Sequence, residues 1–203
     1  MSGCGCEMEA RNAQERKTLK IVLAINFAMF VVELTLGLIA QSSGLITDSL
    51  DMLADASVYA IGLYAVGRSQ NIQGNLVRYS GFILIMLAIF ALSDVVRRFI
   101  YTSEPVSALM IGVGLIALIA NLTSLTLINK HRHDGVHMRA SWIFTRVDVI
   151  ANAGVIVAGI LVLALGSRLP DLIIGSIIAL VVLSGGIKIL REAGAHSTKL
   201  PEV

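Results

Sequence analysis

Charged residues are scarce in this sequence of 203 residues. Asp, Glu, Lys and Arg make up 15% of the chain, against roughly 25% in soluble proteins. The hydrophobic fraction is 56%, above the roughly 45–50% that is usual for a soluble domain. This balance excludes an ordinary soluble protein and indicates a chain built for a lipid environment.

Cysteine is also rare, and its placement excludes a fold held together by disulfides. Cys4 and Cys6 are separated by a single residue in a polar N-terminal segment. Because a disulfide requires a specific separation of its two residues, so close a pair makes a poor covalent link. We expect free thiols on the reducing side of a membrane.

Six apolar segments are long enough to cross a bilayer, which takes roughly 20 mainly apolar residues. Gly, Pro, Asn and Ser separate them, as expected for loops. The sequence therefore predicts an all-α membrane protein with six transmembrane helices. The expected helices cover 19–40, 44–66, 79–99, 106–128, 141–165 and 171–190.

Positive charge is distributed unequally over the two sides of this predicted bundle. Twelve of the sixteen Lys and Arg residues fall on the side of the N-terminus, and three on the opposite side. Cytoplasmic loops are enriched in Lys and Arg, so we expect both termini in the cytosol and a multi-pass protein of the cell inner (plasma) membrane. Residues 1–18 and 192–203 would be short cytosolic tails around a transmembrane domain at 19–191, with no soluble C-terminal domain.

Ionisable residues inside the predicted spans indicate function, because they are costly in lipid. In the second span, Asp48, Asp51 and Asp55 follow the spacing i, i+3 and i+7 and therefore share one helix face. Carboxylates one turn apart repel each other unless a proton or a metal cation lies between them. The alternative for Asp48 is a helix-capping or static polar role.

The fifth span repeats this pattern in the opposite direction. Thr145, Asp148 and Asn152 again follow i, i+3 and i+7. At a rise near 1.5 Å per residue, the antiparallel pair of helices brings Asp55 to the height of Asp148. Asn152 would likewise lie beside Asp51. Four oxygen donors would thus meet near mid-membrane as a cation site; the alternative for Asn152 is a hydrogen bond between helices.

Other polar residues extend this site. Glu33, Asp48 and Thr145 would either support the ligands or relay protons, and a purely structural role is the alternative for Glu33. Arg146 needs a buried anion, which Glu33, Asp48 or Asp94 would supply.

Two features outside the membrane fit metal capture. His131, His133 and His137 lie in the loop before the fifth span and would bind a metal weakly. Cys4 and Cys6 would capture a thiophilic ion. An ordinary polar loop and tail are the alternatives.

Taken together, these segments resemble the cation diffusion facilitators over nearly the whole chain. The stretches 26–37 and 44–55 resemble the opening helix pair of that family, Glu104-Pro105-Val106 resembles the usual start of its fourth span, and 148–155 its second motif helix. The histidine-bearing loop also fits. The resemblance implies six transmembrane helices, a homodimer, and efflux of zinc or a similar ion against protons.

The resemblance also implies a tetrahedral transport site, made of two residues four apart on each of the second and fifth helices. Those positions are Asp51, Asp55, Phe144 and Asp148 in this sequence. Phe144 departs from the family, which usually has His or Asp there, and it cannot bind a metal in this way. The hypothesis is that Asn152, one turn further on, replaces it. The family usually carries a cytosolic domain after the sixth helix, which we do not expect here, so the membrane helices would form the dimer.

The expected function is therefore proton-coupled antiport of a divalent metal out of the cytosol by alternating access. Zinc is the first choice, with cadmium, cobalt, iron and manganese as alternatives, since the carboxylates suit harder ions while Cys and His suit softer ones. We expect no enzyme activity, prosthetic group or nucleic-acid partner. An intramembrane aspartyl protease is disfavoured because its Gly-x-Gly-Asp context is absent. A passive cation channel and a metal-binding scaffold remain alternatives.

Overall fold

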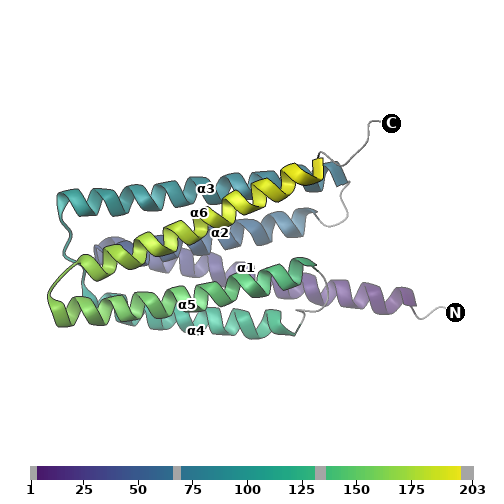
Figure 1. Ribbon diagram of the computed structural model, residues 1–203. Coiled ribbons are helices and arrows are strands. Elements are labelled where there is room, and N and C mark those ends of the chain that lie inside the picture. The colour runs from purple at the N-terminus through teal and green to yellow at the C-terminus, as the bar shows by residue number, and fades with distance from the viewer. Residues whose placement is uncertain (1–3, 66–69, 131–135, 198–203) are drawn as a thin grey trace.

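The computed structural model describes residues 4–65, 70–130 and 136–197, and within these ranges every regular element is an α-helix. The axes of the helices are aligned, and together the helices form an elongated bundle (Figure 1). The predictions of an all-α membrane protein and of six helices are confirmed. The helices are α1 (Cys4–Ile39), α2 (Ser43–Ala65), α3 (Gln70–Tyr101), α4 (Ser107–Asn129), α5 (Val136–Leu165) and α6 (Leu169–Ser197).

Successive helices are antiparallel, so the bundle has two distinct ends. The start of α1 and the end of α6 lie together at one end, which we call the terminal end (Figure 1). The short joints α1–α2, α3–α4 and α5–α6 lie at the opposite end, which we call the joint end.

Several helices are longer than the predicted spans. α1 begins at Cys4 and α6 continues to Ser197, beyond the apolar stretches 19–40 and 171–190. Hydropathy delimits only the part of a helix that lies in lipid, and no proline interrupts these polar extensions. α4 begins close to its predicted start, because Pro105 disfavours helical geometry in the residue before it.

Five of the helices are apolar enough to span a membrane on length and composition: Ala13–Ile39, Asn75–Tyr101, Ser107–Asn129, Phe144–Leu165 and Leu169–Arg191. The helix outside this group is α2. It is 23 residues long, which suffices for a span, but it carries Asp48, Asp51 and Asp55. It packs against α1 and α3 and also contacts α4, α5 and α6.

Small residues allow the helices to approach closely. A Cβ on Gly81 of α3 would lie 3.1 Å from the carbonyl oxygen of Gly186 in α6, and one on Gly186 would lie 3.0 Å from the carbonyl oxygen of Gly81. Such contacts are typical of helix packing in membranes. They hold α3 against α6, and Gly159 makes a similar contact from α5 to Met110 of α4.

Candidate metal centre

The carboxyl groups of Asp55 on α2 and Asp148 on α5 are hydrogen-bonding neighbours across the two helices. The side chain of Asp148 is buried, and its Oδ2 atom has no hydrogen-bond donor. Two neighbouring carboxylates repel each other unless a proton or a cation lies between them. The equal height expected for Asp55 and Asp148 is therefore what the structure has.

Two hydroxyl groups lie on the terminal side of this carboxyl pair. The Tyr59 hydroxyl donates to Oδ2 of Asp55 at 3.2 Å and lies 3.2 Å from Oγ1 of Thr145. Both Tyr59 and Thr145 are buried. Thr145 was predicted from the sequence and Tyr59 was not, although Tyr59 is four residues after Asp55 and so shares its helix face.

Asp51 lies between the other acidic residues of α2. It is close enough to interact electrostatically with Asp48 and Asp55 on its own helix, and with Asp148 on α5. Asp51 and Asp55 are partly exposed, whereas Asp48 is almost fully buried. An ion reaching this part of α2 therefore meets Asp51 and Asp55 before Asp48.

A second polar row lies nearer the joint end. Nδ2 of Asn152 donates to Oδ2 of Asp48 at 2.6 Å, and Oδ1 of Asn152 accepts from Nδ2 of Asn121 at 2.9 Å. The carboxyl group of Glu33 on α1 is fully buried beside Asp48, and neither of its oxygens has a donor. A buried carboxyl pair of this kind needs a shared proton.

This row differs from the expected arrangement of Asn152. Its amide is bonded to Asp48 and Asn121, one helical turn from Asp51, which was its expected neighbour. Asn121 was not predicted, because its signal is a single amide in a mainly apolar helix, α4.

Within the described parts of the chain, no three side chains of the His, Cys, Asp and Glu types are close enough together to hold a metal ion. Three carboxylates repel each other unless a cation or a proton lies between them. Phe144, one turn before Asp148 on α5, brings only an apolar ring to the position where the family has a ligand.

The structure describes little of the five residues that were expected to capture a metal ion outside the membrane. His131 and His133 lie outside the described residues. His137 belongs to α5, and Cys4 and Cys6 belong to α1, but the positions of these side chains are not described. Metal capture by these five residues stays a prediction.

The expectation that Arg146 pairs with a buried anion is wrong. Its side chain is exposed, and its guanidinium carbon lies 4.8 Å from the ring centroid of Trp142. Asp94, one of the expected partners, instead pairs with Arg97 and Arg98 on its own helix, at 2.6 and 2.7 Å. A cation can stack on an aromatic face at a helix surface, which removes the need for a buried partner.

Comparison with known proteins matches residues 19–196 to the cation efflux transmembrane domain. Zinc transporter ZitB of Yersinia pseudotuberculosis is 24% identical over 190 residues, which cover 87% of this chain and 61% of that protein. The metal cation efflux system protein CzcD of Cupriavidus metallidurans is 23% identical over 220 residues, 99% of this chain and 69% of the relative. The "Cadmium, cobalt and zinc/H(+)-K(+) antiporter" of Bacillus subtilis is 21% identical over 192 residues, 86% of this chain and 62% of the relative.

This chain thus spans about three fifths of the length of ZitB. The matched region includes α2 to α5, most of α1 and α6, and every carboxylate described above. The chain belongs to the cation diffusion facilitator family, whose members move metal cations across membranes.

Proposed function

We propose that this protein exports a divalent metal ion, zinc in the first place, from the cytosol in exchange for protons. The observation that carries the proposal is the contact between Asp55 and Asp148, two carboxyl groups on different helices, of which Asp148 is buried and Asp55 is partly exposed. Such a pair binds either a proton or a cation. Metal ligands must be deprotonated to bind. A proton and a metal ion therefore compete for the same carboxyl groups, as an exchanger requires.

The proposed ligands are Asp51, Asp55 and Asp148, with Asn152 as the fourth. Asn152 enters the set when its Oδ1 exchanges the hydrogen bond from Asn121 for the ion. Tyr59 and Thr145 orient the carboxyl group of Asp55 from outside the set. Three carboxylates and an amide are hard donors and would also accept manganese, iron, cadmium or cobalt. Zinc is placed first because the names of the relatives include it.

Glu33 and Asp48 are proposed to take part in the proton exchange. They form a buried carboxyl pair next to the metal site, joined to it through Asn152. A carboxyl pair that is not itself a metal site is suited to hold a proton while the metal ligands are occupied.

We place the protein in the cell inner (plasma) membrane, with the terminal end on the cytosolic side. Among the described residues, the Lys and Arg side chains toward that end are Arg16, Lys17, Lys20, Arg78, Lys130, Lys188 and Arg191, while those near the joint end are Arg97, Arg98 and Arg168. The excess of Lys and Arg on one side supports this orientation. A homodimer formed through the membrane helices completes the proposal.

Flux measurements in proteoliposomes test the proposal directly. Zinc uptake would be followed with and without an imposed pH gradient, for wild type, Asp51→Ala and the control Glu104→Gln, whose side chain is exposed at the joint end. We expect gradient-driven uptake in wild type and Glu104→Gln, and none in Asp51→Ala. Uptake without proton movement would favour a channel. No uptake of zinc or of another divalent metal by either protein, together with a loss of thermal stability in Asp51→Ala, would favour a scaffold.

A further inference from the structure

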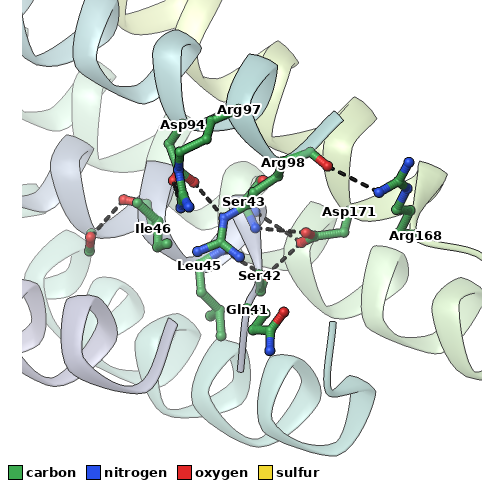
Figure 2. A network of polar contacts seen from close by, with 12 residues as sticks. Gln41, Ser42, Ser43, Leu45, Ile46, Asp94, Arg97, Arg98, Arg168 and Asp171 are labelled. Atoms are coloured by element: carbon green, nitrogen blue, oxygen red, sulfur yellow. Dashed lines mark hydrogen bonds and ion pairs between the residues drawn. The ribbon is translucent and has the colours of Figure 1, made fainter. Parts of the chain in front are cut away.

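The first turn of α2 is bound by a carboxylate from α6, far away in sequence (Figure 2). Asp171 is fully buried. Its Oδ2 accepts the backbone N–H of Ser43 at 2.6 Å, and its Oδ1 accepts the N–H of Gly44 at 2.9 Å and the hydroxyl of Ser42 at 2.6 Å. No role was predicted for Asp171 from the sequence.

These bonds are strong for three reasons. The first N–H groups of a helix have no partner within the helix, hydrogen bonds to an ionised acceptor are roughly twice as strong as neutral ones, and the N-terminus of a helix attracts negative charge. Asp171 supplies a capping carboxylate, but it supplies it to α2 and not to its own helix. The contact therefore joins two helices, and it fixes the helix that carries Asp48, Asp51 and Asp55.

The seam around this contact is closed. A Cβ on Gly175 of α6 would lie 3.0 Å from the carbonyl carbon of Ser43, so α6 approaches the backbone of α2 directly. Ser43 and Thr47 are almost completely buried. Further along α2, exposure increases: Asp51 and Asp55 are partly exposed and Tyr64 is 58% exposed.

Arginines join the end of α3 to the same seam (Figure 2). Arg98 is buried, pairs with Asp94, and attracts Asp171 electrostatically. Arg168, three residues before Asp171, donates from Nη1 to the carbonyl oxygen of Arg98 at 3.1 Å and from Nη2 to that of Phe99 at 3.2 Å. The start of α6 thus holds the joint ends of both α2 and α3.

We propose that Asp171 is the positioning residue of the gate at the joint end, and that its bonds to the start of α2 keep the aspartates of α2 closed to that side. A transporter that alternates must break this contact to release its ion there, and re-forming it returns the site to the terminal side. The inference rests on the proposed function, because a gate has a purpose only in a transporter. Whether the Asp171 carboxylate keeps the seam closed can be measured independently of transport.

The test uses a cysteine reporter behind the seam. Cys4→Ser and Cys6→Ser remove the native thiols, and Thr47→Cys places a single thiol one turn deeper than Ser43. Thr47 is buried and its hydroxyl has no hydrogen-bond partner, so this substitution breaks no bond. The rate of modification by a charged methanethiosulfonate would be measured in lipid nanodiscs for the parent, Asp171→Asn and the control Glu104→Gln, which also removes one negative charge at the joint end.

We expect Asp171→Asn to raise the modification rate of Thr47→Cys by about ten-fold, which corresponds to about 1.4 kcal/mol in the closing equilibrium. Glu104→Gln should leave the rate unchanged. A second reporter, Ala117→Cys, lies fully buried on α4 away from the seam, in the cluster with Met29 and Met52. Its rate should not change in Asp171→Asn.

Two outcomes overturn the gate. Equal rates for Thr47→Cys in the parent and in Asp171→Asn would show that the carboxylate does not hold the seam closed. Increased rates at both reporters would show a general loosening of the bundle, and Asp171 would then be a structural cap.

Transport kinetics separate this proposal from the proposed function. A weakened gate lowers the population open to the terminal side, so Asp171→Asn should raise the apparent KM for zinc entering from that side, in proportion to the population lost, and leave the binding residues intact. If both reporters respond as expected but the parent moves no zinc under a pH gradient, the gate stands and the zinc–proton exchanger fails. If the parent moves zinc under a pH gradient and the reporters show no change, the zinc–proton exchanger stands and the gate fails.

Discussion

The side-chain amide of Asn152 donates a hydrogen bond of 2.6 Å to the carboxylate of Asp48, and this bond ties α5 to α2 inside the bundle. It lies next to the proposed metal site, so the two possible roles of Asn152 make opposite predictions. As a ligand, Asn152 controls metal affinity. As a helix tie, it controls stability only.

For Asn152 as the fourth ligand, we expect Asn152→Ala to weaken zinc binding by about ten-fold or more, since one lost ligand exceeds about 1.4 kcal/mol. Asn152→Asp should bind zinc at least as tightly as wild type, because a carboxylate replaces the amide. Isothermal titration of the purified protein measures both. If Asn152→Ala lowers the melting temperature while zinc affinity stays at the wild-type value, the residue is a tie between helices.

Removal of one charge from the carboxyl pair should stabilise the metal-free protein. Asp148→Asn gives Asp55 a hydrogen-bond donor and relieves the repulsion between the two carboxylates. We expect the unfolding midpoint without metal to rise, and the stabilisation by added zinc to disappear. Thermal unfolding with and without zinc is the measurement, with Glu104→Gln as the control that changes neither value. A lower midpoint in Asp148→Asn would argue that the pair is held by other partners.

The hydroxyl group of Tyr59 is expected to contribute to the stability of the protein and to its zinc affinity. Tyr59→Phe keeps the ring but removes the bonds to Asp55 and Thr145, and a lost buried hydrogen bond costs about 1–2 kcal/mol. We expect a matching loss of stability and a smaller loss of zinc affinity than in Asp55→Asn. Tyr101→Phe is the matched control, because that side chain is 77% exposed. Equal stability of the two variants would contradict the role given to the hydroxyl.

Glu33 offers a test of proton coupling. Glu33→Gln keeps the shape of the side chain and supplies an N–H donor to Asp48, so the fold should keep its stability. If Glu33 carries a proton in each cycle, fewer protons should move per zinc ion than in wild type. Zinc-sensitive and pH-sensitive dyes in the same vesicles give this ratio. An unchanged ratio with unchanged flux would remove Glu33 from the exchange.

The close approach of α6 to α2 predicts a contrast between two glycines. Gly175→Ala would place a methyl group 3.0 Å from the backbone of Ser43, and overpacking of this kind costs about 1–3 kcal/mol. Gly62→Ala on α2 meets nothing within 4 Å and should gain some of the roughly 1 kcal/mol by which Ala exceeds Gly in a helix. Opposite shifts of the unfolding midpoint are expected. A neutral Gly175→Ala would show that the seam yields easily.

The sequence was sufficient for the parts of the site that depend on periodicity. The six helices follow from apolar length, and the shared face of Asp51 and Asp55 follows from their spacing on one helix. The height match of Asp55 and Asp148 also follows, because the rise per residue in an antiparallel pair is fixed.

The remaining features depend on how helices rotate and tilt against one another, which spacing along one helix does not specify. Asn152 bonds to Asp48 instead of Asp51 because these two aspartates are less than one turn apart on α2, and the rotation of α2 against α5 decides which of them Asn152 reaches. Asp171 was missed because an acidic residue in the first turn of a helix is ordinarily a cap for its own helix. Arg146 was misjudged because its exposure depends on which face of α5 turns away from the bundle.

The helix with the proposed metal ligands Asp51 and Asp55 is also the one least able to enter a bilayer. Insertion of each Asp at the centre of a span costs about 2.5–3.5 kcal/mol, and α2 carries three, whereas its neighbour α1 is strongly apolar between Ala13 and Ile39. The joint between them is short, and Gly37 packs directly against Leu45 and Ile46. During synthesis, α2 is therefore expected to enter the membrane as one half of a hairpin with α1, so that assembly of the cargo site depends on the first helix before the last three have been made.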